Sequence, residues 1–345
     1  MTGTPSAPLR MREMLYGALL SRALCTAAVM GVPDALAEGP RGVADLAAEL
    51  DAVPDALGQL LRTLTAFEVF ERLPDGTYAL TPLGAALRTD AHATAYPTAL
   101  LVDGVMGASW TALATTVRTG RPGFEDVHGM SLFDYLDRHP AVRETFDHSQ
   151  AADLQLSLEH IRSAVGPVGS TVVDVGGGDG TLLAHLLAGA PDARGVLLDT
   201  QATTVRAKEV LAAAGLEERS RVVAGDFFEA VPGDGDLYLL REILHDWNDS
   251  QCVTVLGACR RAMRPGTRLL IIERVAADDE GAAGTSRMTA LMDLYMLSVL
   301  RGQERSLGDY DRLLSASGFV RTSVSRMPGH VVAIEAAPDP GGSPG

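Results

Sequence analysis

Three consecutive glycines stand between an apolar strand pattern and an apolar helix pattern, and they restrict the fold more than any other feature. The segment reads Val172-Val173-Asp174-Val175-Gly176-Gly177-Gly178-Asp179-Gly180, followed by Thr181-Leu182-Leu183. A glycine turn after a strand is typical of open α/β sheets, which bind ligands at the carboxyl ends of their strands. A tight turn without a ligand is the weaker interpretation, because adjacent glycines cost chain entropy. The turn therefore predicts a site for a nucleotide-like ligand.

The turn lacks the signatures of a phosphate site. In a G-x-G-x-x-G frame that starts at Gly176, the third glycine position is Thr181, and no P-loop lysine follows. These differences disfavour NAD and ATP. S-adenosylmethionine has no phosphates, and Gly176 and Gly178 would let the backbone approach its amino-acid portion. The turn therefore favours this sulfonium cofactor.

Two further acidic residues follow predicted strands. Asp199 ends the strand Val196-Leu197-Leu198, about 20 residues beyond the glycines, where an acidic side chain binds ribose hydroxyls. The next strand is followed by Gly225-Asp226-Phe227-Phe228. The Asp226 carboxylate suits an adenine amino group and the Phe227 ring suits an adenine face. The order of these signals along the sheet strengthens the prediction of a bound nucleoside.

Strand and helix patterns alternate from Thr171 onward. Strands are predicted at Thr171–Val175, Gly195–Leu198, Val222–Ala224, Leu237–Leu240, Arg268–Glu273, Val320–Ser325 and His330–Ala336. Helices are predicted near Leu182–Gly189, Thr203–Ala214, Ser250–Met263 and Leu307–Ser317. This alternation predicts an α/β fold with a Rossmann-like, doubly wound, mostly parallel sheet over 166–338, and the last two strands predict an antiparallel edge. Residues 339–345 are predicted to be a disordered tail.

The first half of the chain predicts helices around one hairpin. The first dozen residues are expected to be a mobile arm, and Met14–Val32 is expected to be a buried helix, either in the core or in a dimer interface. A helix-turn-helix pattern at 43–64 and a Pro-Asp-Gly hairpin at 71–81 predict a winged-helix-like domain over 1–93. The segment 94–165 is predicted to be a helical connector. Its aromatic residues, Trp110 among them, form either ordinary core or the roof of an aromatic-substrate pocket.

Composition excludes several classes of protein. The net charge is −15 and Lys208 is the only lysine, which disfavours binding to nucleic acid, so a winged-helix regulator is the weakest of three functional hypotheses. The three scattered cysteines predict neither a metal site nor disulfides. Neither a signal peptide nor an apolar run of about 18 residues is recognisable. We expect a cytoplasmic protein without a metal and without a membrane partner.

A histidine follows the fourth predicted strand of the sheet. The segment reads Arg241-Glu242-Ile243-Leu244-His245-Asp246-Trp247. Methyl transfer to oxygen needs a base, because a hydroxyl is a poor nucleophile until it loses its proton, and a histidine can supply this base if a carboxylate orients its ring. Glu273 and Glu304 are the candidates for that carboxylate. A structural histidine and surface glutamates are the alternative interpretation.

These motifs together resemble a known family. Val-Asp-Val-Gly-Gly-Gly-Asp-Gly at 173–180, Gly-Asp-Phe-Phe at 225–228, Leu-His-Asp-Trp at 244–247 and Gly-Gln-Glu-Arg-Ser at 302–306 are similar to the caffeate-type S-adenosylmethionine-dependent O-methyltransferases. In style the chain is similar to the actinobacterial enzymes that modify aromatic polyketides and related natural products. The resemblance implies a homodimer, formed through the winged-helix-like half, and methylation of a hydroxyl on a bulky aromatic small molecule.

The resemblance also implies roles for individual residues. It assigns cofactor contacts to Gly176, Asp199, Asp226, Phe227 and Arg241, the last in place of the lysine usual in plant members. It assigns the general base to His245, with Glu273 and Glu304 flanking it. It places Met292, Asp293 and Met296 along the acceptor pocket.

Some members of this family carry out other reactions. They methylate carbon or nitrogen, or use the bound sulfonium in hydroxylation, decarboxylation or pericyclic chemistry. O-methylation is favoured because His245 and both glutamates are present. Orientation of the reactants can supply much of the rate without a base.

Overall fold

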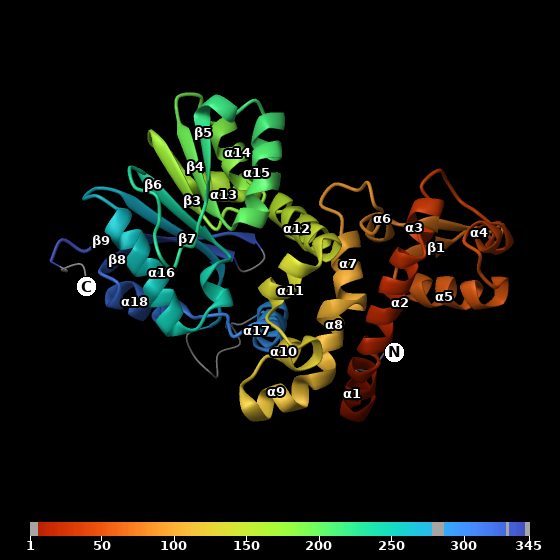
Figure 1. Ribbon diagram of the computed structural model, residues 1–345. Helices are drawn as coiled ribbons and strands as arrows, with labels where there is room; N and C mark the ends of the chain where they lie inside the picture. The colour runs from red at the N-terminus through yellow and green to blue at the C-terminus, as the bar shows by residue number, and fades with distance from the viewer. Residues whose placement is uncertain (1–5, 278–285, 329–330, 342–345) are drawn as a thin grey trace. The chain divides into compact units, whose positions relative to one another are not determined.

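A computed structural model describes residues 6–277, 286–328 and 331–341. The chain divides into two compact units, which are described separately (Figure 1). The first unit comprises Met1–Ala108 and Pro140–Gln155, and the second comprises Ser109–His139 and Leu156–Gly345. The predicted connector 94–165 is thus shared between the two units, since its helix Pro140–Gln155 packs on Tyr96–Asp103 of the first unit.

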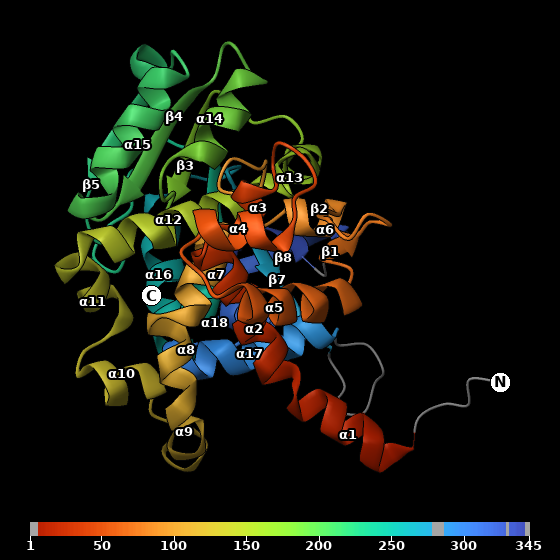
Figure 2. The ribbon, with the colours of Figure 1, turned by 90° about the vertical axis from the view of Figure 1, so that its right-hand side faces the viewer.

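The first unit is helical apart from one hairpin. Its elements are α1 (Ala7–Leu15), α2 (Gly17–Val29), α3 (Val32–Ala35), α4 (Val43–Glu49), α5 (Pro54–Ala66), β1 (Phe70–Arg72), β2 (Tyr78–Leu80), α6 (Pro82–Ala85), α7 (Tyr96–Asp103), α8 (Val105–Ser109) and α12 (Pro140–Gln155). Helices α4 and α5 and the antiparallel β1–β2 pair form the predicted helix-turn-helix and hairpin (Figure 2). The core of this unit includes Leu46, Leu61, Leu64, Phe70 and Tyr78, each at most 2% exposed.

The N-terminal segment differs from its prediction. Helix α1 begins at Ala7, within the stretch expected to be a mobile arm, because Pro8 fits the first helical turn and the residues after it favour helix. The helix predicted over Met14–Val32 is interrupted at Tyr16 and ends before Gly31, whose φ of 75° suits glycine. Only part of it is buried, since Leu15 is 70% and Leu19 66% exposed whereas Ala27 and Ala28 are in the core.

The second unit contains the predicted sheet. Its strands are β3 (Thr171–Val175), β4 (Arg194–Asp199), β5 (Ser220–Ala224), β6 (Leu237–Arg241), β7 (Arg268–Arg274), β8 (Phe319–Arg326) and β9 (Val331–Pro338). Their order is β5-β4-β3-β6-β7-β9-β8, and the first five are parallel. Strand β9 is antiparallel to both β7 and β8, so the antiparallel strand lies one place inside the edge. His330, the first residue of the last predicted strand, lies outside the described residues.

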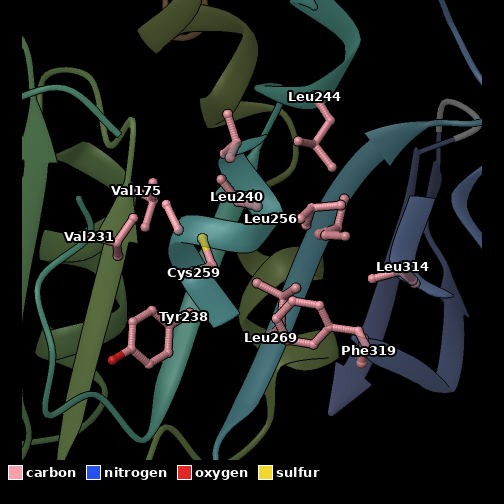
Figure 3. Packing of buried hydrophobic residues seen from close by; sticks show 14 of the residues in the cluster. Val175, Val231, Tyr238, Leu240, Leu244, Leu256, Cys259, Leu269, Leu314 and Phe319 are labelled. Carbon is pink, nitrogen blue, oxygen red and sulfur yellow. The ribbon is translucent and has the colours of Figure 1, made fainter. Parts of the chain in front are cut away.

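Helices cover both faces of this sheet. They are α13 (Leu158–Val165), α14 (Thr181–Ala188), α15 (Gln201–Ala213), α16 (Asp249–Ala262) and α18 (Leu307–Ala316). Helices α13, α14 and α15 lie on one face, and α16 and α18 lie on the other (Figure 1). Between the sheet and α16 the side chains of Tyr238, Leu256, Cys259 and Leu269 pack together and are fully buried (Figure 3). This core holds the carboxyl ends of β3 to β7 in fixed register, where the site lies.

Shorter elements complete the second unit. They are η1 (Trp110–Ala112), α9 (Leu113–Thr119), α10 (Gly123–His128), α11 (Leu132–Arg138), η2 (Glu217–Arg219), η3 (Leu244–Asp246) and α17 (Arg287–Val299). Helix α17 packs against α9 and α10. The sequence of residues 278–285 predicts a loop, either one that gates entry or a plain surface loop, and this segment lies outside the described residues, as do residues 342–345 of the predicted tail.

Among the described residues, one stretch, Tyr96–Thr119, is long and apolar enough by length and composition to cross a membrane. This is weak support for a membrane span, because core helices pass the same test. The stretch contains Asp103, and Gly104 leaves the helical conformation between α7 and α8, with φ −96° and ψ −123°.

Candidate functional site

The glycine turn after β3 forms a cradle made of backbone. Gly176, Gly178 and Gly180 have φ values of 72°, 57° and 82°, which disfavour any side chain. The Gly176 amide donates to the Leu198 carbonyl at 2.8 Å, which ties the turn to the end of β4. A Cβ on Gly177 would lie 2.8 Å from both Asp174 Cγ and Leu197 Cγ, so this position also excludes a side chain.

Two carboxylates flank the cradle. Asp199, at the end of β4, accepts a hydrogen bond from the Gly178 amide at 2.9 Å and another from the Thr200 amide at 2.7 Å. Asp174 is 2% exposed, and its Oδ2 has no hydrogen-bond partner among the described residues. Burial, reinforced by Asp199 and opposed by Arg241, raises the pKa of Asp174 from its ordinary value near 3.8 to about 7.

Three other residues assigned to the cofactor lie after β5 and at the end of β6, at the same edge of the sheet as the glycine turn. Asp226, after β5, is exposed and accepts from the Phe228 amide at 2.8 Å. Phe227 is half-buried, and its Cε1 lies 3.6 Å from the position of a Cβ on Gly176. Arg241, at the end of β6, pairs with Glu242 at 2.8 Å, and both side chains are largely buried. Glu242 has a φ of 50°, a strained conformation for a residue other than glycine.

The chemistry and arrangement of these groups fit S-adenosylmethionine. The glycines leave room for backbone approach, and the unpartnered Oδ2 of Asp174 is an acceptor in the wall of the cradle that an ammonium group would satisfy. Asp199 presents a carboxylate for hydroxyls, and Phe227 adjoins the cradle with an aromatic ring. The described residues hold no group of three or more His, Cys, Asp or Glu side chains arranged to bind a metal ion.

The structure brings His245, Glu273 and Glu304 together. His245 lies on η3 and is 6% exposed. Its Nδ1 lies 3.4 Å from Glu304 Oε1 and 3.6 Å from Glu273 Oε2. Its Nε2 lies 3.4 Å from Oδ1 of Asp246, a neighbour to which the sequence pattern assigns no role.

The electrostatics of this cluster favour a charged imidazole. Burial alone lowers the pKa of His245, but the carboxylates of Glu273, Asp246 and Glu304 outweigh it and raise the pKa to about 10. Glu273 is fully buried at the end of β7, where its Oε1 accepts from the amides of Ile243 and Leu244 at 3.1 and 2.8 Å. Glu273 therefore holds the backbone before His245 with one oxygen and faces its ring with the other.

Two residues outside the expected set complete this cluster. A Cβ on Gly302 would lie 1.8 Å from the His245 carbonyl oxygen, so only glycine lets the 302–305 segment run beside η3. Arg305 is 1% exposed and donates to carbonyls of the same turn. The motif at 302–306 was the available signal for both residues, but burial of an arginine is not readable from sequence.

The residues assigned to the acceptor lie mainly on α17. Met296 is buried, Met292 is half-buried, and Asp293 is exposed and accepts from the Glu304 amide at 2.9 Å. Asp293 is thus joined to the segment that carries Glu304. Trp110 stands on η1 with 39% exposure, and η1 packs on α10.

An aromatic cluster stands beside η3. The ring of Trp247 stacks on Phe133 of α11, with centroids 5.9 Å apart, and makes a T-shaped contact with Phe228, with centroids 4.8 Å apart. Phe227 also reaches Trp247, at 6.2 Å. The loop after β5 and the turn that carries His245 are therefore joined by contacts between aromatic rings.

Comparisons with known proteins agree with this geometry. Residues 110–320 match the model of an O-methyltransferase domain, and residues 12–90 match that of an O-methyltransferase dimerisation domain. An O-methyltransferase of Streptomyces lavendulae is 43% identical over 94% of this chain and 99% of its own. The O-demethylpuromycin-O-methyltransferase of Streptomyces alboniger is 38% identical over 95% of this chain and 89% of its own. Other relatives are named as N-methyltransferases.

A solved structure extends the comparison. It is an O-methyltransferase from neocarzinostatin biosynthesis in complex with S-adenosylmethionine and 2-hydroxy-5-methyl naphthoic acid. It has a TM-score of 0.79 and 32% identity, covering 92% of this chain and 96% of its own. By sequence, by fold and by the match over most of its length, the chain belongs to the O-methyltransferase family and is an S-adenosylmethionine-dependent methyltransferase with a dimerisation domain.

Proposed function

We propose that this enzyme methylates a hydroxyl of a bulky aromatic secondary metabolite, with His245 as the general base. The observation that carries the proposal is the buried imidazole of His245, with Glu273 and Glu304 on its Nδ1 side. Relatives named for aromatic acceptors support the acceptor class. We further propose a cytoplasmic homodimer that binds neither nucleic acid nor membrane.

The proposed mechanism assigns one task to each ring nitrogen. In the neutral imidazole, Nδ1–H donates to a carboxylate and Nε2 accepts the proton of the acceptor hydroxyl. The carboxylates of Glu273, Glu304 and Asp246 stabilise the imidazolium that results. When bound, the cofactor supplies an electrophilic methyl group on a cationic sulfur. The acceptor oxygen would form its bond to the methyl carbon as the carbon–sulfur bond breaks, its proton would pass to His245, and S-adenosylhomocysteine would leave.

Each residue assigned to the cofactor is proposed to bind the part of the cofactor that it would face. Gly176 and Gly178 would admit the amino-acid portion, Asp199 would accept from the ribose hydroxyls, and Asp226 and Phe227 would bind the adenine. Arg241, held by Glu242, would contribute its charge at the end of β6. On the acceptor side, Trp110, Met292, Asp293 and Met296 are proposed to contact the substrate. We also propose a functional division of the chain. Residues 1–93 would form the dimerisation domain, 94–165 a connector that contributes to the substrate pocket, and 166–338 the domain that binds the cofactor.

The test is incubation of the purified enzyme with S-adenosylmethionine and a panel of phenolic acceptors. We expect S-adenosylhomocysteine and a product heavier by one methylene for at least one phenol. Matched anilines separate nitrogen from oxygen as the acceptor, a distinction that the N-methyltransferase relatives make necessary. Methylation of anilines alone would contradict the choice of oxygen, and a product that gains oxygen or loses carbon dioxide would contradict methyl transfer.

A further inference from the structure

The turn that carries His245 is weakly held by its own hydrogen bonds. Within η3 and at its end, the Asp246 amide donates to the Ile243 carbonyl at 3.3 Å, and the Trp247 amide donates to the Leu244 carbonyl at 3.3 Å. Both distances are longer than the ordinary range for such bonds. A single 3₁₀ turn offers few other bonds, so neighbouring groups must fix the direction of the imidazole.

Arg305 supplies part of that support from outside the turn, together with Glu273, which accepts from the amides before His245, and the Cys252 thiol, which donates to the same two carbonyls as Arg305. Arg305 Nη1 donates to the Leu244 carbonyl at 2.7 Å, and its Nη2 donates to the Trp247 carbonyl at 2.7 Å. These two carbonyls lie on either side of His245 and Asp246. A planar guanidinium can bridge them because its donors have a fixed geometry, which a lysine ammonium cannot reproduce.

The buried charge of Arg305 is balanced at the same place. Asp249 Oδ1 accepts from Arg305 Nε at 3.0 Å and from Nη2 at 2.8 Å. Gln303 Nε2 donates to the same oxygen at 3.2 Å. All three guanidinium nitrogens therefore have partners, as a charge that is 1% exposed requires.

Arg305 follows Glu304 directly in the sequence. The segment that holds the His245 turn is therefore the same segment that carries the carboxylate of Glu304. The Gln303 amide donates to the His245 carbonyl at 2.9 Å, and the Arg305 carbonyl accepts from the Ala276 amide at 3.0 Å. Three successive residues thus contact the turn in three ways: Gln303 through its backbone, Glu304 at the imidazole, and Arg305 at the flanking carbonyls.

We propose that Arg305 is a positioning residue that fixes the distance between His245 and Glu304 by holding both ends of the His245 turn. The inference rests on the proposed role of His245 as base. Arg305 contacts neither ring nitrogen, so it acts through the geometry of the turn.

Arg305→Lys tests this role in the full-length protein. We expect kcat to fall about 10- to 100-fold with the best phenolic acceptor, because a small displacement of a catalytic group has effects of that size. The Kd for S-adenosylmethionine, measured by calorimetry, is expected to stay unchanged. Arg321→Lys, in an exposed pair with Asp311, is the matched control and is expected to keep the wild-type kcat.

A second readout reports on the imidazole directly. Proteins labelled with ¹³C-histidine are titrated by NMR, and the His245 signal is assigned by its loss in His245→Gln. Four carboxylates face or adjoin this ring: Glu242, Asp246, Glu273 and Glu304. In Arg305→Lys we expect the His245 titration to move to lower pH, because Glu304 no longer stays against Nδ1. A folded variant with an unchanged His245 titration overturns the proposal, whatever its kcat.

A double variant separates this proposal from the base hypothesis. If Arg305 acts through His245, then Arg305→Lys causes no further loss of kcat in the His245→Gln background, and an additive loss overturns the proposal. If His245→Gln alone keeps the wild-type kcat, the base role fails, while the NMR titration still decides the positioning role. Should Arg305→Lys not fold, Asp249→Asn, which removes the balancing charge, is tested by the same titration and is expected to move it the same way.

Discussion

At the scale of single residues, the site depends on charges that are buried together. Water cannot screen the carboxylates around His245, so they raise its pKa to about 10 against the opposing effect of burial. A base must be unprotonated to accept a proton. The shift therefore places the active form of His245 on the alkaline side and makes the imidazole a stronger base than an exposed one.

The raised pKa of His245 predicts how turnover depends on pH. We expect the kcat of the wild type to increase as pH rises from 7 towards about 10, as His245 loses its proton. His245→Gln should lower kcat about 100-fold and remove this increase, with the Kd for S-adenosylmethionine unchanged. The exposed His160→Gln is the matched control. Near wild-type kcat in His245→Gln would eliminate the base role.

Asp174 predicts a pH dependence of stability. Its folded-state pKa of about 7 exceeds the ordinary 3.8, so its contribution to stability is complete below pH 3.8 and is lost as pH rises through 7. The loss amounts to at most about 4 kcal/mol. The free energy of unfolding is measured by urea titration at pH 5 and at pH 8, without cofactor. In Asp174→Asn, the part of its decrease between these two pH values that is due to Asp174 should be absent. The exposed Asp192→Asn should keep the wild-type pH dependence, and the same dependence in Asp174→Asn would refute this assignment.

At the scale of elements, the site is built where strand ends meet a returning loop. Strands β6 and β7 end side by side, which brings Glu273 under the backbone of Ile243 and Leu244. The loop before α18 then closes over the turn, and its approach depends on Gly302. The Gly302 position has no room for a methyl group beside the His245 carbonyl.

Gly302→Ala tests this close approach. We expect a loss of about 1–3 kcal/mol in the free energy of unfolding, because the added Cβ forces the backbone apart, together with a lower kcat. Gly257→Ala on α16 is the control, since its Cβ would have only ordinary contact with Arg261 at 3.5 Å. Urea unfolding and turnover measure both effects. Wild-type values for Gly302→Ala would show that the loop is not held as described.

At the scale of the whole molecule, the dimerisation domain leaves apolar side chains uncovered within one chain. Helix α1 has no buried residue, and exposed apolar residues continue into α2: Leu9, Met11, Met14, Leu15, Tyr16 and Leu19. A run of exposed apolar residues of this kind is typical of an interaction site. We expect the second copy of the chain to cover it.

Charge on this surface should separate the two copies. Leu15→Asp combined with Leu19→Asp is expected to shift the protein from dimer to monomer in sedimentation velocity, because each leucine contributes about 1.5–3 kcal/mol when buried. Val53→Asp, at an exposed valine before α5, is the control and should leave the dimer intact. A double variant that sediments like the wild type would place the interface elsewhere.

The sequence by itself determined the succession of strands along the second unit, the main helices between them and the position of the glycine turn, because these follow from local periodicity and backbone preference. It also placed the candidate cofactor residues at strand ends, since parallel strands share one edge. It misjudged residues 7–12, where weak local preferences compete, and it did not specify that β9 inserts between β7 and β8.

Only the tertiary structure decided which carboxylates face His245 and how its turn is held. Glu273 and Glu304 were both named from sequence, but their distances to Nδ1, the contact of Asp246 with Nε2 and the burial of Arg305 arise from contacts between segments up to 61 residues apart. Such contacts depend on packing, which local pattern does not encode. Motifs thus identify the chemical groups, and the folded chain sets their distances and charges.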